Sequence, residues 1–500
     1  YLKNNLRLGG YLNSDLPHLL VQIHKQSCAA VLARPVSLIF NLSLRDGIFP
    51  EAWKLASITP VHKTGNMHNI ENYRPISILN CLAKVLESLL HDALYPIVQP
   101  VISEFQHGFV KKRSTTSNLM SYTNMLINRI EKRQQVDAVY VDFSKAFDKV
   151  PHNLAILKLD RLGLPSWIIN WLTSYLSSRK AFVKVHGAKS CEFAIPSGVP
   201  QGSHLGPLIF VLFVNDLCDS LRSEKILYAD DLKIFRTIHS LVDCCALQDD
   251  IERLSVWCQE NGMHTNAGKC KVITFTRGRT PMLHNYALLL SPLQRVNSIK
   301  DLGVILDSKL RFHEHISVTI SKTNAMLGFL RRNTVHFDDA YTLKSLYCSL
   351  VRSVLEYAVQ VWAPYHAVHI QRIERVQKRF VRYVLRGLPW NNPANLPPYE
   401  ERCALIGMQT LESRRVMLQR LYIFDVLSGN IDCNNILQSL CLHAPARQLR
   451  HQQFLWISSH RTTYGQHNPL DACCRSFNQV SEVFGFNISK LVYKNRIKLL

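Results

Sequence analysis

The sequence predicts an α+β fold in which strand hairpins in the first half of the chain precede a helical region. Short apolar runs interrupted by polar or acidic turns predict hairpins over residues 55–79 and 225–235. Apolar residues at helical spacing predict helices over 336–430. Hydrophobic residues make up 47% of the chain and charged residues 19%, which is a globular composition. The 500 residues suit roughly two to four domains.

The charge balance points to a polyanionic partner. Lys and Arg number 59 against 37 Asp and Glu, a net charge of +22, which favours nucleic acid or an acidic membrane surface. No run of about 18 apolar residues is present, so no membrane span is expected. The 14 cysteines follow no repeated short spacing, and because we expect no signal peptide, reduced thiols are favoured. The chain begins with Tyr, so we expect a fragment of a longer product.

The elements are predicted in the following order along the chain. Residues 1–60 are expected to be mostly helical, with a break near 46–53 where Gly and Pro occur. The 55–79 hairpin carries Lys63 on one arm and Arg74 on the other. A strand is predicted in 135–147 and ends at Asp142, and helices are predicted over 153–179 with a break near Gly163 and Pro165. A strand pair and a Gly/Pro loop then lead to a helix from about Leu205. The last prediction is a helix end, a loop and a strand over 256–275.

Two adjacent acids in an apolar run, Asp230 and Asp231 of "KILYADDLKIF", need a partner, because an unpaired buried charge is costly. Asp142 ends another predicted strand, and neighbouring strand ends could bring it beside Asp230. Carboxylates that converge repel one another unless a divalent cation lies among them, and oxygen ligands favour Mg²⁺ or Mn²⁺. Adjacent strand residues face opposite sides, so Asp230 is expected to bind the metals directly and Asp231 to assist. The alternative is that the pair is ordinary turn chemistry.

Seven motifs, taken in their order along the chain, resemble those of one protein family. They are "ENYRPISILN", "GFVKKRSTTSNL", "YVDFSKAFDKVPH", "SGVPQGSHLGPLIF", "YADD", "IKDLGVILDSKLRFHEHI" and "LYCSLVRSVLEYAVQVWAP". In this order the chain resembles the reverse transcriptases of non-LTR (LINE-type) retrotransposons of the jockey and CR1 kind. The resemblance extends over nearly the whole chain, and it implies a right-hand polymerase with fingers, a palm with an antiparallel sheet, and a helical thumb. The apurinic-type endonuclease that usually precedes such a polymerase is not evident.

The resemblance assigns the polymerase acids and the nucleotide pocket. Asp142, Asp230 and Asp231 match the catalytic, metal-binding acids. Phe143 would present its backbone amide to the triphosphate, and its side chain could equally be core. Phe147 matches the aromatic steric gate that excludes a ribose 2′-hydroxyl; ordinary core packing is the alternative. The last matches in this group are Gln201, which helps to shape the pocket, and Gly202, which permits close backbone approach to substrate.

The remaining assignments concern phosphates and the primer. Lys63 and Arg74 match triphosphate contacts, although Lys63 could be a solvated loop charge. Lys269 resembles the lysine that protonates the departing pyrophosphate, and the nearby Lys271 is a competing choice. Finally, the family's primer grip corresponds to Leu302 and Gly303, where packing alone would also explain Leu302.

The implied organisation is an N-terminal extension (1–39), fingers and palm (40–315), a helical thumb (316–430) and a C-terminal extension (431–500). The implied activity copies RNA into DNA by two-metal nucleotidyl transfer with Mg²⁺ (or Mn²⁺). The implied partners are an RNA template, a DNA primer or nicked target DNA, and dNTPs. No membrane partner is expected. The expected site of action is the nucleus, with cytoplasmic assembly on RNA possible; the sequence gives no oligomeric state. One rival is a catalytically inactive or domesticated RNA-binding remnant. Another is an RNA polymerase with the same palm, which Phe147 argues against.

Overall fold

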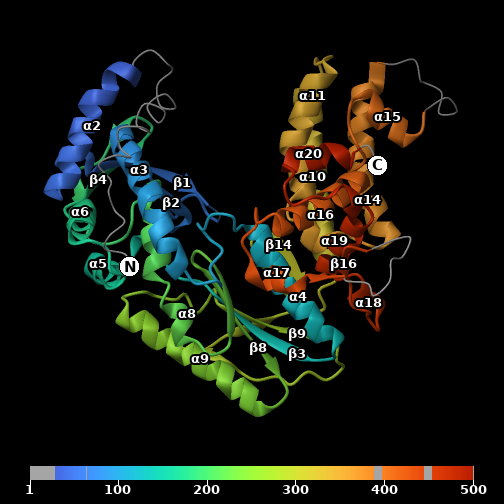
Figure 1. Ribbon diagram of the computed structural model, residues 1–500, viewed down its shortest axis with the longest axis horizontal. Helices are drawn as coiled ribbons and strands as arrows, with labels where there is room; N and C mark the ends of the chain where they lie inside the picture. The colour runs from blue at the N-terminus through green and yellow to red at the C-terminus, as the bar shows by residue number, and fades with distance from the viewer. Residues whose placement is uncertain (1–28, 64, 388–396, 444–452, 499–500) are drawn as a thin grey trace.

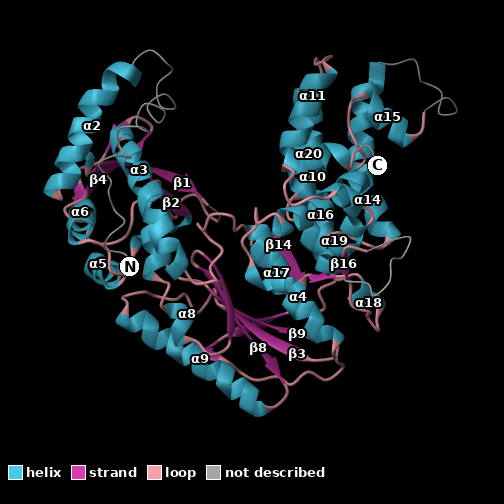
Figure 2. Cartoon of the chain, in the orientation of Figure 1, coloured by secondary structure: helices cyan, strands magenta, loops and turns pink. Residues whose placement is uncertain are grey.

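The computed structural model describes residues 29–63, 65–387, 397–443 and 453–498. Two arms rise from a central sheet (Figure 1), and helices make up most of both arms (Figure 2). The first arm comes from the N-terminal half of the chain and the second arm from residues 313–498. The predicted N-terminal extension, residues 1–39, is described only from residue 29 onward. Within the described ranges, no helix is both long and apolar enough to cross a membrane.

The first arm and the central region contain α2 (Ala29–Asp46), α3 (Cys81–Val98), α4 (Thr115–Glu131), α5 (His152–Arg161), α6 (Ser166–Leu176), α7 (Leu205–Phe213), α8 (Leu217–Ser220) and α9 (Leu241–Glu260). Local sequence explains several of these boundaries. A capping box of Ser114 and Ser117 begins α4 by satisfying its first amides. The predicted helix break after residue 161 is confirmed, with Gly163 in the left-handed region at φ 76° and Pro165 capping α6.

The strands of the first arm are β1 (Leu55–His62), β2 (Tyr73–Ile78), β4 (Lys180–Val185), β5 (Ala188–Lys189) and β6 (Phe193–Ala194). Their order is β2-β1-β4-β5, with β6 also on β4. The predicted hairpin over 55–79 is confirmed, because β1 and β2 pair antiparallel from Ser57↔Ile78 to His62↔Tyr73. Lys63 therefore begins the hairpin loop, directly after His62 at the end of β1.

The central sheet contains β3 (Gln135–Val141), β7 (Glu224–Tyr228), β8 (Asp231–Ile238), β9 (Lys271–Phe275) and β12 (Gln294–Val296). The order is β12-β9-β3-β8-β7, and every pair is antiparallel except β12–β9. The short β10 (Ala287–Leu288) pairs with β11 (Ser291–Pro292), and β13 (Ser298–Asp301) pairs with β14 (Val304–Asp307). Because β3 and β8 are neighbours, the end of β3 lies beside the start of β8, with Val141 opposite Leu232.

In the residues that the structure describes, the second arm is helical apart from β15 (Cys441–Leu442) and β16 (Leu455–Trp456). Its helices are α10 (His313–Asn333), α11 (Ala340–Tyr347), a π-helical segment (Cys348–Arg352), α12 (Ser353–Glu356), α13 (Val359–Trp362), α14 (Ala367–Val384), α15 (Tyr399–Leu405), α16 (Leu411–Leu427), α17 (Asn434–Ser439), α18 (Thr463–Gln466), α19 (Pro469–Asn478) and α20 (Lys490–Arg496). The prediction of a helical region over 336–430 is confirmed for its described part.

The central sheet separates two hydrophobic cores. Along β3, Val139 and Val141 belong to the core of the first arm, whereas Val136 and Ala138 belong to the core of the second arm. The residues after 430 share the second core with α4 and with the helices of 313–427. The ends of β3 and β8 therefore lie where both arms meet the sheet.

Candidate active site

The turn between β7 and β8 holds the acidic pair. Tyr228 pairs with Asp231, which leaves Ala229 and Asp230 as the two turn residues. Ala229 has φ 56°, as the first central residue of a type II′ turn does. The hairpin tip predicted for these acids is confirmed, but Asp230 lies in the turn itself, while Asp231 is the first residue of β8. The two carboxylates are therefore not equivalent.

Asp142 follows the last residue of β3, next to this turn. Its backbone amide donates to Sγ of Cys270 at 3.4 Å, and its carbonyl oxygen accepts from the amide of Asn266 at 2.8 Å. The loop before β9 thus holds Asp142 in place. The structure brings Asp142 close enough to Asp230 for their charges to interact, as the pairing of β3 with β8 predicts.

Asp230 and Asp231 sit in an environment that opposes their ionisation. Desolvation raises the pKa of Asp230, the charge of Asp142 raises it further, and Lys63 and Arg74 partly offset both effects. Although Asp231 as a whole residue is exposed, desolvation of its carboxyl, followed by the charge of Asp230, raises its pKa to about 6. A cation among these carboxylates would offset the cost of ionising them.

The donor set suits a hard divalent cation that takes some of its ligands from the protein and others from a substrate. Among the residues that the structure describes, no three His, Cys, Asp or Glu side chains are gathered as a ready-made metal site. Mg²⁺ usually takes one or two protein carboxylates and completes its octahedron with water and phosphate oxygens. Asp142 and Asp230 fit that requirement, since each has oxygen donors and they repel each other when no cation is present.

The structure separates the two candidate lysines: Lys269 lies in the loop before β9, and Lys271 is the first residue of β9. Nζ of Lys269 lies 4.0 Å from Oδ2 of Asp142, and the Lys269 side chain is largely exposed. Nζ of Lys271 instead contacts Oε1 of Gln294 at 2.5 Å and the carbonyl oxygen of Gly268 at 3.0 Å. Of the two, Lys269 is the one beside the acids.

Lys63 and Arg74 lie at the tip of the β1–β2 hairpin, where Arg74 pairs across the strands with Val61. Both side chains are exposed, and both charges reach Asp230. An ammonium and a guanidinium therefore face the acids from the first arm, as a phosphate-bearing substrate would require.

The ring of Phe147 is half-buried and packs between two other rings. It stacks on Phe210 with centroids 4.2 Å apart and meets the edge of Phe109 at 5.9 Å. Its position is fixed from the backbone as well, since its carbonyl oxygen accepts from the amide of Val199 at 2.8 Å. Phe143, by contrast, is buried in the core of the first arm, in agreement with the packing alternative for its side chain.

Gln201 and Gly202 lie in a loop that touches both β2 and the Phe147 segment. The Gln201 side chain donates to Oδ1 of Asp148 at 2.7 Å, and its carbonyl oxygen accepts from the amide of Ser77 at 2.9 Å. Gly202 has φ 117°, and a Cβ there would lie 2.7 Å from the carbonyl oxygen of Ser77. Close backbone contact therefore requires glycine at this position.

Leu302 and Gly303 form the turn between β13 and β14. Leu302 has φ 42°, and its carbonyl oxygen accepts a 2.7 Å hydrogen bond from the hydroxyl of Tyr357. A Cβ on Gly303 would lie 3.0 Å from the ring of Tyr357. Tyr357 is 41% exposed. Burial raises the pKa of Tyr228, and the nearby phenol of Tyr357 raises it further, so the Leu302–Gly303 turn lies near the acidic turn.

Residues 61–306 match the family model described as "Reverse transcriptase (RNA-dependent DNA polymerase)". The chain contains a reverse transcriptase domain. In the terms of the right-hand fold, we refer to the central sheet as the palm, to the first arm as the fingers, and to the second arm as the region of the expected thumb. The predicted resemblance to non-LTR retrotransposon polymerases is confirmed, as is the right-hand α+β fold class.

Relatives of the reverse transcriptase domain include several transposon proteins. The chain is 32% identical over 375 residues to the RNA-directed DNA polymerase from mobile element jockey of Drosophila funebris, covering 71% of this chain and 40% of the relative. It is 29% identical over 393 residues to a probable RNA-directed DNA polymerase from transposon BS of Drosophila melanogaster, covering 73% and 43%. The chain thus spans about two fifths of the length of these relatives. A solved structure of apo telomerase from Candida tropicalis matches with a TM-score of 0.40 and 11% identity, covering 75% of this chain and 66% of the telomerase chain.

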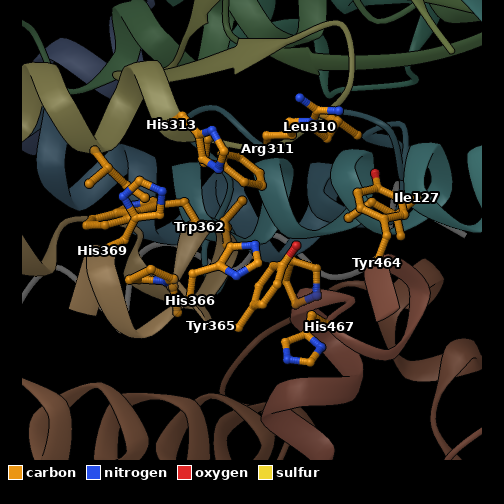
Figure 3. A pocket seen from close by; sticks show the side chains of 16 residues that line it. Ile127, Leu310, Arg311, His313, Trp362, Tyr365, His366, His369, Tyr464 and His467 are labelled. Atoms are coloured by element: carbon orange, nitrogen blue, oxygen red, sulfur yellow. The ribbon is translucent and has the colours of Figure 1, made fainter. Parts of the chain in front are cut away.

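A separate small cavity lies outside the reverse transcriptase acids, where the start of α10, the start of α14 and the α18 region meet (Figure 3). Its volume of about 30 Å³ admits one or two water molecules. Histidine and tyrosine side chains surround it, among them His313, His366, His369 and Tyr365. None of the predicted site residues lines this cavity.

Sequence reasoning missed three residues around the site of the reverse transcriptase domain. Phe109 touches the Phe147 ring, Gln106 contacts the acidic turn, and Tyr357 holds the Leu302 carbonyl. Phe109 and Tyr357 lie in stretches that carry the family resemblance, so a signal was present, but nothing in the local pattern predicts their partners. Those contacts depend on tertiary structure alone.

Proposed function

We propose that this chain is an RNA-directed DNA polymerase that extends a primer 3′ end by copying an RNA template. The observation that supports it best is the meeting of Asp142 and Asp230 opposite Lys63 and Arg74 within a reverse transcriptase domain. Acids on one side and cations on the other suit a nucleoside triphosphate bound through divalent ions. The net charge of +22 suits a nucleic-acid template and primer.

In the proposed mechanism, the fingers hold the incoming dNTP and the palm holds the reacting atoms. Lys63 and Arg74 bind the triphosphate and offset its charge, and the guanidinium can do so through two parallel hydrogen bonds. Asp142 and Asp230 would hold Mg²⁺, which when bound lowers the pKa of the primer 3′-hydroxyl and stabilises the charge on the leaving pyrophosphate. Lys269, 4.0 Å from Asp142, would give a proton to the pyrophosphate as it leaves.

Sugar and primer selection follow from the remaining residues. Phe147 presents a flat ring that leaves no room for a 2′-hydroxyl, and the Phe210 stack prevents that ring from moving aside. Gln201 is bonded to Asp148, the residue after Phe147, so its proposed effect on the pocket is to fix the Phe147 segment. The Leu302–Gly303 turn would hold the primer end. The natural primer would be nicked target DNA, which implies action in the nucleus, with assembly on RNA in the cytoplasm.

Primer extension tests this proposal. The purified chain is given an RNA template with an annealed DNA primer, dNTPs and Mg²⁺, and we expect incorporation that Asp230→Asn and Asp142→Asn each abolish. Asp219→Asn, an acid in α8 away from the site, serves as the matched control and should keep full activity. A folded wild-type protein that binds the primed template without incorporating dNTPs would refute the polymerase and leave the RNA-binding alternative. Preferential use of rNTPs by the wild type would instead indicate an RNA polymerase.

A further inference from the structure

The segment Phe105–Arg113 runs directly alongside the Ala229–Asp230 turn. Gln106 forms a parallel bridge with Leu227, the penultimate residue of β7. The amide of Leu227 donates to the carbonyl oxygen of Phe105, and the amide of His107 donates to the carbonyl oxygen of Leu227, both at 2.9 Å. The segment therefore extends the edge of the palm sheet up to the point where the chain turns toward Asp230.

One side chain of this segment satisfies both peptide groups of the first turn residue. Oε1 of Gln106 accepts from the amide of Ala229 at 2.8 Å and from the amide of Gly108 at 2.7 Å. Its Nε2 donates to the carbonyl oxygen of Ala229 at 3.3 Å. Gln106 is only 2% exposed, so water does not compete for these bonds.

Ala229 needs such support because its backbone is strained. Its φ of 56° lies in the left-handed region, and the first central position of a type II′ turn strongly favours glycine. The contact also constrains Gly108, since a Cβ there would lie 2.2 Å from the amide nitrogen of Ala229. Gly108 therefore allows the segment to approach, and Gln106 then holds the turn in a conformation that alanine resists.

The segment is in turn fixed by the C-terminal extension. Nη1 of Arg113 donates to the carbonyl oxygens of Ser103 at 2.9 Å and Gln106 at 2.8 Å. The same guanidinium contacts Oδ2 of Asp432 at 3.1 Å through Nη2 and at 3.3 Å through Nε. The amide of Asp432 donates to the carbonyl oxygen of Lys112 at 3.0 Å. A carboxylate 319 positions away thus orients the arginine that organises the segment.

We propose that Gln106 is a positioning residue that holds the Ala229–Asp230 turn so that Asp230 can share a divalent cation with Asp142, and that the Arg113–Asp432 pair braces it from the C-terminal extension. This inference rests on the proposed polymerase function. Neither residue touches substrate. Their effect is on the direction of the Asp230 carboxylate, so their loss lowers kcat and metal affinity while the KM for dNTP stays nearly unchanged.

The first test replaces Gln106 with a side chain of similar shape that makes none of its hydrogen bonds. Gln106→Met should lower kcat about 10- to 100-fold, as small misplacements of reacting groups do. Binding of Mn²⁺ alone, followed by electron paramagnetic resonance without nucleotide or template, should weaken in the same variant. Gln259→Met, on the exposed face of α9, is the matched control and should leave both quantities unchanged.

A second substitution separates positioning from general structural damage. Ala229→Gly removes the backbone strain, so the turn no longer needs Gln106, and Gln106→Met/Ala229→Gly should recover most of the lost kcat and Mn²⁺ affinity. Asp432→Asn, far from the acids, should cause a smaller loss that Ala229→Gly also reverses. It provides the same test if Gln106→Met does not fold.

Wild-type kcat and Mn²⁺ affinity in Gln106→Met would overturn the positioning role, as would a failure of Ala229→Gly to restore a folded Gln106→Met protein. Wild-type behaviour of Asp432→Asn would overturn the brace. If the wild-type chain extends no primer, the polymerase proposal fails, whereas the Mn²⁺ measurements and their rescue still decide whether Gln106 positions the turn.

Discussion

Lys233 and Asp301 form an ion pair with Nζ and Oδ2 2.7 Å apart, and their side chains are only 1% and 2% exposed. Lys233 lies on β8, two residues after Asp231, and Asp301 immediately precedes the Leu302–Gly303 turn. Asn118 accepts a second hydrogen bond from Lys233 at 2.8 Å. The pair therefore ties the strand of the acidic turn to the hairpin that would hold the primer.

Removing one partner of this pair should strongly destabilise the protein. Lys233→Met would leave Asp301 buried without a counter-charge, so we expect a loss of about 3–5 kcal/mol in the free energy of unfolding, measured by urea denaturation. Lys233→Met/Asp301→Leu should recover part of that loss. Lys111→Met breaks the exposed pair with Asp92 and should cost at most about 1 kcal/mol. Equal effects of Lys233→Met and Lys111→Met would contradict the assigned role of burial.

Asp231 should make the stability of the metal-free protein depend on pH. Its pKa is raised to about 6 in the folded chain, against about 3.9 in an unfolded one. Between these values the folded state holds a proton that the unfolded state has lost, so this contribution to stability is present at about pH 4 and declines as the pH rises through 6. Calorimetric melting should show that the stability of the wild type relative to Asp231→Asn falls as the pH rises through 6. Added Mg²⁺ should make this fall smaller at pH 7. A difference that does not change with pH would show that the carboxyl has an ordinary pKa.

Phe147→Ala should relax sugar discrimination. Without the ring, a ribose 2′-hydroxyl fits, so the ratio of kcat/KM for dNTP over rNTP should fall at least about tenfold, a change of about 1.4 kcal/mol in relative transition-state binding. Single-nucleotide extension with each substrate measures it. Phe210→Leu removes the stack that keeps this ring in place, so it should lower stability and cause a smaller fall in the same ratio. An unchanged ratio in Phe147→Ala would mean that the ring is only core.

Tyr357→Phe should weaken primer binding. The substitution removes the 2.7 Å hydrogen bond to the Leu302 carbonyl oxygen, and a single hydrogen bond of this kind contributes about 0.5–1.5 kcal/mol. We expect the KM for primed template to rise about 2- to 10-fold, while the KM for dNTP stays constant. Tyr341→Phe, at a 76% exposed position on α11, is the control. A rise confined to the dNTP KM would place Tyr357 in the nucleotide pocket instead.

The sequence was sufficient for the features that depend on local pattern. Asp142 and Asp230 could be placed together because strand patterns and turn residues predict where each strand ends. The same holds for the 55–79 hairpin with Lys63 and Arg74 at its tip. Whether Lys269 or Lys271 faces the acids could not be predicted, because the boundary between the loop and β9 falls between the two residues and the local pattern does not fix it.

Contacts between distant segments could not be predicted from the sequence. The bonds from Gln106 to Ala229 and from Arg113 to Asp432 join segments separated by 123 and 319 positions, and neither end has a motif that names its partner. For the same reason, residues 431–500 carried little signal on their own. Their apolar side chains become meaningful only in the core that they share with α4.

The shared core of α4 and the C-terminal residues has a consequence for how the chain reaches its native state. Asn468 donates from Nδ2 to Oδ1 of Asn124 at 2.9 Å, a contact that spans 344 positions. During synthesis, α4 leaves the ribosome hundreds of residues before its covering helices exist, so its apolar face stays without its final partners until those helices have emerged. Such non-local closure is slow and exposes surface that can aggregate or recruit chaperones. The core that α4 shares with these helices is therefore completed only after they have emerged.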